Sequence, residues 1–454
     1  VMRWFRKQNL CCNAAWGLIL GCALLLATPA MAVDEAMLER MEELIQQQQR
    51  QIEAQAKAIE KLQQQVGTMK EEAVKEATEA ARTEFATAVA DPARSPARAK
   101  DVVTHANDKL SLQIYGQVNR GGLFADDGDS SDYYFVDNDN SSSRFGFLGE
   151  SKVNEDITVG TRMEFEYQSN PSNTVNQDDK NPDGESFDDR WVDGQITSKR
   201  FGKLYIGKGS TASDNTSEID LSGTAVVGYS SIADMSGGIR FYDDDSNTLS
   251  TTNIGDVFSN FDGLSRRNRI RYDSPSFAGF KLMASALSDG GDVALSYAAK
   301  WGENWKFAAA AAYANPTAVS DETDNQYNGS ASILHSSGLN LTVAGGYRDL
   351  ENNLTNPDGS DRDDDPTFYY AKLGYRANFF DAGETRFSVD YSRNEDVDQD
   401  RDDANTVGAQ IVQDMPDWGM EYYLGYRWHE LNRGEGTTDF DDINAVMSGV
   451  RLKF

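Results

Sequence analysis

The 454-residue sequence predicts an all-β transmembrane barrel of about 16 antiparallel strands, preceded by an α-helical coiled-coil segment. Three observations predict this fold. The chain begins with an export signal, apolar and polar residues alternate in segment after segment from Lys109 onward, and short and long connections alternate between those segments. A water-soluble sandwich shares the alternation of residues, but it has no reason to sort its connections by length.

The composition excludes several classes of protein. There are 73 Asp plus Glu against 43 Lys plus Arg, a formal net charge of −30. This argues against a nucleic-acid partner, because phosphate contacts need clustered Lys and Arg side chains. A mean hydropathy of −0.59 argues against a polytopic helical membrane protein. The chain has only three His and no nucleophile–base signature, so we expect no enzymatic activity and no cofactor.

The N-terminal residues 1–32 are predicted to be a signal peptide. A basic start is followed by an apolar run over 14–27 and by the small-x-small cleavage site Ala30-Met31-Ala32. A membrane anchor is less favoured, because the apolar run is shorter than the roughly 20 residues of a spanning helix. All three cysteines lie within the signal, so we expect a mature chain without disulfides.

A heptad pattern follows, and it predicts a periplasmic coiled coil over 33–90 and a linker over 91–108, ahead of the barrel at 109–454. Gln48 and Gln55 occupy two seam positions and weaken the seam. A lone amphipathic helix packed on its own chain is the alternative, and the heptads alone do not distinguish a dimer from a trimer. The apolar seam residues are Leu38, Met41, Ile45, Ile52, Ile59, Leu62, Val66 and Met69.

Period-two alternation then predicts the strands. Aromatic pairs beside the short turns, such as Trp301 and Trp305, are typical of an interfacial girdle, and the chain ends in Phe454. The predicted strands lie near 110–124, 143–152, 157–169, 187–197, 202–209, 268–274, 280–287, 292–301, 306–314, 326–335, 339–349, 367–376, 385–395, 404–413, 420–430 and 442–454.

Three short segments and the terminal residue resemble the Gram-negative trimeric porins, across roughly Lys109 to Phe454. They are Ser143-Arg144-Phe145-Gly146-Phe147, Phe201-Gly202-Lys203-Leu204-Tyr205-Ile206-Gly207, Arg271-Tyr272-Asp273-Ser274-Pro275-Ser276-Phe277-Ala278-Gly279 and the terminal Phe454. A coiled coil ahead of the barrel resembles the DcaP-like group. The resemblance implies a homotrimer of outer-membrane barrels that passively conduct small hydrophilic solutes. It also implies contacts with outer-membrane lipid and lipopolysaccharide, and with the barrel assembly machinery, for which Phe454 would be the signal.

The same resemblance implies a constriction inside the barrel. Arg144 and Arg190 match the positions of a family arginine ladder, and the long connection 210–267 takes the place of the constriction loop. This loop lacks the Pro-Glu-Phe-Gly-Gly stretch of general porins, and it is long enough to hold a further strand or helix. Strand parity adds three pore-lining arginines, and three loop acids are expected to face them: Arg162, Arg269 and Arg271, and Asp214, Glu218 and Asp220.

The sequence therefore predicts an outer-membrane diffusion channel for small hydrophilic solutes, anions among them. The alternative is a structural envelope tether, because a helix over 38–69 would reach about 48 Å at 1.5 Å per residue and approach the peptidoglycan. An outer-membrane enzyme ranks last. The acidic run 358–365 is a candidate for weak Ca²⁺ binding only, since it lacks the loop-ending Glu of an EF-hand.

Overall fold

A computed structural model describes residues 46, 47, 50, 57, 102–107, 109–182, 186–317, 320, 322–352, 354–434 and 438–454. The chain divides into two compact units, Val1–Ala77 and Thr78–Phe454. In the first unit, the four described residues are helical and exposed. The predicted signal peptide and nearly all of the heptad seam lie outside the described residues, so both stay predictions.

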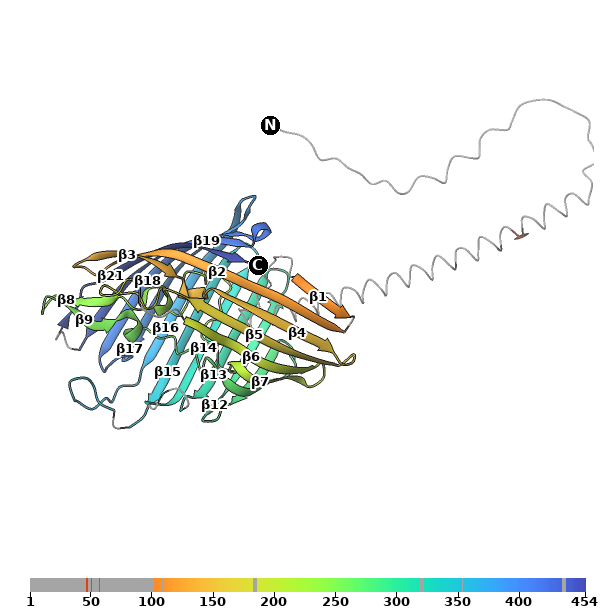
Figure 1. The fold of residues 1–454 in the computed structure, drawn as a ribbon, viewed down its shortest axis with the longest axis horizontal. Coiled ribbons are helices and arrows are strands. Elements are labelled where there is room, and N and C mark those ends of the chain that lie inside the picture. The colour runs from red at the N-terminus through yellow and green to blue at the C-terminus, as the bar shows by residue number, and fades with distance from the viewer. Residues whose placement is uncertain are drawn as a thin grey trace, which may run out of the picture. The chain divides into compact units, whose positions relative to one another are not determined.

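Sixteen antiparallel strands of the second unit form a closed barrel, and all sixteen predicted strands are confirmed (Figure 1). Each strand pairs with the next, and the first and last close the barrel from Gln117 opposite Lys453 to Asp126 opposite Asn444. The strands are β2 (Leu110–Asp126), β4 (Arg144–Lys152), β5 (Ile157–Gln168), β6 (Ser186–Ser198), β7 (Gly202–Ser210), β10 (Arg266–Asp273), β11 (Phe280–Ala286), β12 (Gly291–Trp301), β13 (Trp305–Asn315), β14 (Thr323–His335), β15 (Leu339–Leu350), β16 (Thr367–Phe380), β17 (Gly383–Glu395), β18 (Asp402–Met415), β19 (Met420–Arg433) and β21 (Ile443–Lys453).

Three short strands extend this sheet and were not predicted. β3 (Ser131–Asp137) pairs with the second half of β2, from Arg120 to Asp126. β20 (Thr438–Asp439) pairs with β19. β1 (Val102–Asn107) pairs with the start of β2, so six residues that were expected within the linker 91–108 form a strand. The β-branched start of β1 favours a strand, but the segment is too short for its alternation to be recognised.

The wall of the barrel is apolar outside and polar inside. Along β19, Tyr422, Leu424 and Tyr426 are exposed, whereas Tyr423 and Arg427, which have the opposite parity, are buried. This is the reverse of a water-soluble protein, and it suits a wall whose outer face contacts lipid. Within the described residues, no helix is long and apolar enough to cross a membrane.

Two rows of exposed aromatic residues follow the outer face of the barrel. The row beside the short turns is the predicted girdle and includes Trp305. On β13, Tyr313 of the second row lies eight residues further on, about 27 Å along the strand at ~3.4 Å per residue. Strand tilt reduces that separation to a height near the ~25 Å apolar band of an outer-membrane barrel. Tyr313, Tyr327, Tyr347, Tyr369, Tyr391 and Tyr426 form the second row.

Most of the long connection 211–265 packs against the inner face of the barrel, and the tip of its hairpin is exposed. It contains α2 (Ala233–Ser236), the hairpin of β8 (Arg240–Asp243) and β9 (Thr248–Asn253), and α3 (Ile254–Val257). Its apolar side chains, with Phe241, Phe258 and Phe261 almost fully buried, pack against inward residues of the wall such as Phe368 and Met447. We call 211–265 the lumen loop.

Small inward side chains make room for this loop. Ala308 and Ala310 on β13 pack against Ile219 of the loop. Two hydroxyls on the next strand accept hydrogen bonds from the loop backbone: the Oγ of Ser330 from the Ile219 amide at 2.8 Å, and the Oγ of Ser332 from the Leu221 amide at 3.0 Å. Loop backbone groups that would be left unpaired inside the barrel are therefore satisfied by the wall.

Candidate constriction site

A group of partly exposed arginines lies on the strands β4, β6, β10 and β21. Arg144 begins β4, Arg190 lies on β6 and Arg451 on β21, with side-chain exposures of 12%, 12% and 15%. Arg266 at the start of β10 lies 3.9 Å from Asp214 of the lumen loop. We call these four residues the basic wall.

One buried glutamate organises much of the basic wall. Glu164 on β5 accepts hydrogen bonds from Arg162 at 2.7 Å and from Arg190 at 2.8 Å, and Arg144 lies 3.9 Å from it. Tyr115 donates to the same carboxylate at 2.6 Å. Charge-assisted bonds of this kind fix both the distance and the direction of the guanidinium groups. The arginines therefore face the lumen in fixed positions.

A β-bulge brings Arg190 of the basic wall and the neighbouring Trp191 into the site. Glu164 is paired with Trp191 and Phe165 with Asp189, so Arg190 is the extra residue in β6. As a result Arg190 and Trp191, although consecutive, both contact inward-facing residues. The Trp191 ring lies beneath the guanidinium group of Arg162, 4.1 Å from its centroid. Bulges re-aim side chains in this way, and strict alternation in the sequence could not predict it.

Arg269 and Arg271 lie on the inner face of β10 but are almost fully buried. Arg269 is paired with Asp193 at 2.8 Å and Arg271 with Asp273 at 2.7 Å. Both also donate to backbone carbonyls where β7 ends and the lumen loop begins: Arg269 to Ser210 at 3.0 Å, and Arg271 to Thr211 at 2.7 Å. These two predicted arginines therefore fix the first residues of the lumen loop to the barrel wall.

The three predicted loop acids occupy different environments. Asp214 is buried near Arg266, Asp220 is paired with the buried Lys372 on β16 at 2.8 Å, and Glu218 accepts a hydrogen bond from Asn260 at 2.9 Å. Burial opposes ionisation of Asp220, but the Lys372 ammonium outweighs it and lowers the pKa of that carboxyl. Asp220 is thus a loop anchor with its charge neutralised.

Other carboxyls of the lumen loop gather around Glu218 with few cations near them. Burial, together with the neighbouring Asp214 carboxylate, raises the pKa of Glu218 to about 7. Burial and nearby carboxylates also raise the pKa of Asp234 and Asp262 well above the ordinary value. Like charges held this close do not all ionise. At neutral pH the loop therefore carries less negative charge than its acid count suggests.

Four contributors to the site were not predicted: Arg266, Arg451, Asp234 and Asp262. Strand parity could have found Arg451, since Val450 and Leu452 were placed on the outer face. Arg266 lies two residues before the predicted start of its strand, so it was assigned to the loop. The described part of the chain contains no group of three or more His, Cys, Asp or Glu arranged to hold a metal ion.

A closed sixteen-stranded barrel with an apolar outer wall and an internal loop opposite a basic wall defines the class of transmembrane channels called porins. The chain belongs to the Gram-negative porin family, whose model matches residues 85–434. It is 25% identical over 374 residues to outer membrane porin C of Salmonella typhimurium, which covers 75% of this chain and 91% of that protein. Its family places it in the outer membrane.

Two solved structures share the fold. The anion-selective porin from Comamonas acidovorans has a TM-score of 0.50 and 14% identity, and a loop-deletion form of OmpT, an outer membrane protein of Vibrio cholerae, has a TM-score of 0.50 and 15% identity. Each match covers 76% of this chain and 100% of the other. At these identities the likeness concerns the fold alone.

Proposed function

We propose that this porin is a passive diffusion channel that favours small anions over small cations. The observation that carries the proposal is the partly exposed basic wall, with Arg144 and Arg190 opposite a loop whose acids are paired or raised in pKa. Arg144 and Arg190 share the buried Glu164, Arg190 is also paired with Glu166, and both arginine side chains keep an exposed fraction of 12%.

The physical basis is focusing of the field inside a narrow lumen. A charge in a narrow lumen with low-dielectric walls acts over a longer distance than a solvated charge at the surface. There the screening length is only about 8 Å at physiological salt. Acidic residues on the exposed loops therefore contribute less to ion selectivity than the basic wall does. The other three predicted arginines are more deeply buried, and each is paired with a carboxylate that reduces its effect on a permeating ion. The pairs are Arg162 with Glu164, Arg269 with Asp193 and Arg271 with Asp273.

The test is the reversal potential of the purified protein in a planar bilayer under a gradient of KCl. We expect a sign that corresponds to chloride preference, and passage of a small carboxylate or phosphate ion when it replaces chloride. A potassium-preferring channel would overturn the anion preference and leave the channel function intact. A folded, inserted protein without conductance would overturn the channel and favour the envelope tether.

We also propose that three copies assemble through the outer face of β2 to β6. Arg120 lies midway along β2 on this face, half-exposed between Val118 and Phe124, and is paired with the buried Asp137 at 2.7 Å. An arginine at the middle of a lipid-facing wall is costly, so cover by protein fits it better than cover by lipid. The same face carries a cluster of aromatic rings: Phe145, Phe147, Phe165 and Phe187.

A further inference from the structure

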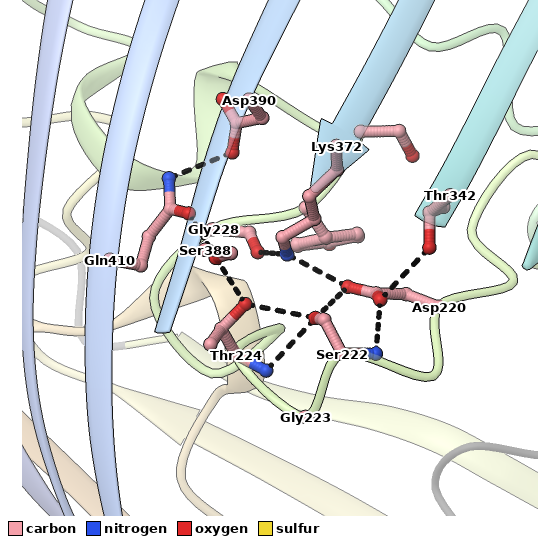
Figure 2. A network of polar contacts seen from close by, with 12 residues as sticks. Asp220, Ser222, Gly223, Thr224, Gly228, Thr342, Lys372, Ser388, Asp390 and Gln410 are labelled. Carbon is pink, nitrogen blue, oxygen red and sulfur yellow. Dashed lines mark hydrogen bonds and ion pairs between the residues drawn. The ribbon is translucent and has the colours of Figure 1, made fainter. Parts of the chain in front are cut away.

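Consecutive strands place a row of polar side chains against the middle of the lumen loop (Figure 2). Thr342 on β15 is opposite Lys372 on β16, and Lys372 is opposite Asp390 on β17. The row continues to Arg427 on β19, which reaches Asp390 at 2.9 Å across Gly408. A Cβ on Gly408 would lie 2.5 Å from the Asp390 carboxylate, so the glycine leaves the space for this pair.

Lys372 is the member of this row that binds the lumen loop at two points. Its side chain is fully buried, and its ammonium group donates to the Asp220 carboxylate at 2.8 Å and to the Gly228 carbonyl at 2.6 Å. These two loop residues are eight positions apart, so one cation closes the loop segment between them against the wall. Asp220 also accepts hydrogen bonds from the amide and hydroxyl of Ser222, at 2.7 and 2.9 Å.

We propose that Lys372 is a positioning residue of the constriction, which fixes how far the loop segment 220–228 stands from the wall and thereby the width of the passage. The proposal rests on the channel function proposed above. A buried charge that loses its partner keeps the cost of desolvation without the compensating attraction. Without Lys372, the Asp220 carboxylate either reaches water or takes up a proton, and in both cases segment 220–228 loses the ion pair and the Gly228 contact that hold it to β16.

The first experiment compares Lys372→Met with Lys306→Met in single-channel recordings. Lys306 lies on the inner face of β13 near the short turns, so its replacement also removes one positive charge and leaves the contacts of Lys372 with Asp220 and Gly228 in place. We expect Lys372→Met to raise the frequency of closing events about tenfold and to alter the open conductance. We expect the closing frequency of Lys306→Met to equal that of the unmodified protein. Equal closing frequencies in all three proteins would overturn the proposal.

A disulfide supplies the rescue. The hydroxyl oxygens of Thr224 on the loop and Ser388 on β17 lie 2.7 Å apart (Figure 2), so the pair Thr224→Cys and Ser388→Cys can tie the loop to the wall beside Lys372. In the Lys372→Met background, oxidation should return the closing frequency to that of the unmodified protein, and a reductant should reverse the effect. A loss of folding would not be rescued in this reversible way, and closures that persist after complete oxidation would overturn the proposal.

Asp220→Asn keeps the test open if Lys372→Met does not assemble, since it preserves the shape of the side chain and its contact with Ser222. We expect more frequent closures than in the unmodified protein and fewer than in Lys372→Met. Unchanged closures in an assembled Asp220→Asn channel would overturn the proposal. A conducting unmodified protein with unaffected variants refutes only the role of Lys372, whereas an unmodified protein without conductance refutes the channel function itself.

Discussion

Gly374 on β16 lies directly beneath Ser222 of the lumen loop: a Cβ at Gly374 would approach the Ser222 Cβ to 3.0 Å. The absent side chain at this inward position lets the loop lie against the wall two residues from Lys372. The position of the loop in the lumen therefore depends on the small size of a single residue on a barrel strand.

We predict that Gly374→Leu displaces the lumen loop and changes the single-channel conductance. Overpacking of a close contact costs about 1–3 kcal/mol, and here the loop can relieve it by moving toward the passage. The control is Ala371→Leu, which adds bulk to the exposed outer face of the same strand. Equal conductance in the two variants would contradict the prediction.

The strands could be predicted from the sequence because their signal is local. A strand that separates lipid from a polar interior must alternate over its whole length, so each of the sixteen is visible in its own ten or so residues. The boundary errors fall where this signal ends. Arg266, for example, belongs to β10 by pairing with Ser210, yet it precedes the alternation.

The contacts of the lumen loop could not be predicted in the same way. Lys372 and Asp220 are 152 residues apart, and Arg269 and Asp193 are 76 apart. Which loop residue lies over which strand depends on the path of the whole loop. The sequence contains one indirect signal, the run of small residues at inward positions such as Ala308, Ser330 and Gly374, which indicates that something packs inside the barrel.

Neutralising the partly exposed arginines of the basic wall should shift ion selectivity more than neutralising the buried Arg269 and its partner. We predict that Arg144→Gln with Arg190→Gln moves the reversal potential toward cation preference by at least ~10 mV, against a limit of ~59 mV for a perfectly selective pore in a tenfold gradient. Arg269→Gln with Asp193→Asn removes a buried pair of zero net charge and should have the smaller effect. The reverse order would place the permeation path beside Arg269.

Phe454 should be needed for efficient assembly. Its backbone exchanges hydrogen bonds with Gly116 at 2.9 and 3.0 Å, and a Cβ on Gly116 would lie 2.5 Å from the Phe454 ring, so the ring rests on this glycine where the barrel closes. We predict that Phe454→Ala lowers the amount of folded, detergent-resistant protein several-fold at equal expression, as measured by heat-modifiable mobility on gels. Phe454→Tyr keeps the ring and serves as the control; normal assembly of both variants would contradict the prediction.

The heptad segment is predicted to support the oligomer without being needed for the barrel. Deletion of residues 36–69 should weaken the trimer on mild detergent gels and in crosslinking, and should leave barrels that insert and conduct. Conduction is expected to persist because the described wall and loop are complete without these residues. If the unmodified protein itself runs as a monomer and yields no crosslinked trimer, the trimer is wrong. If the deletion stops conduction in inserted protein, the segment has a role inside the channel.

Glu218 should make the selectivity depend on pH near neutrality. Burial raises the pKa of this carboxyl to about 7, so it is neutral below that pH and negative above it. Each ionised Glu218 adds a negative charge opposite Arg266 and Arg190, which opposes the entry of anions. We therefore predict that anion preference, measured as the reversal potential, is higher at about pH 5.5 and falls as the pH rises through about 7. Glu218→Gln should hold the low-pH value throughout this range, because the amide cannot ionise. A pH step of unchanged size in Glu218→Gln would assign the titration to another group.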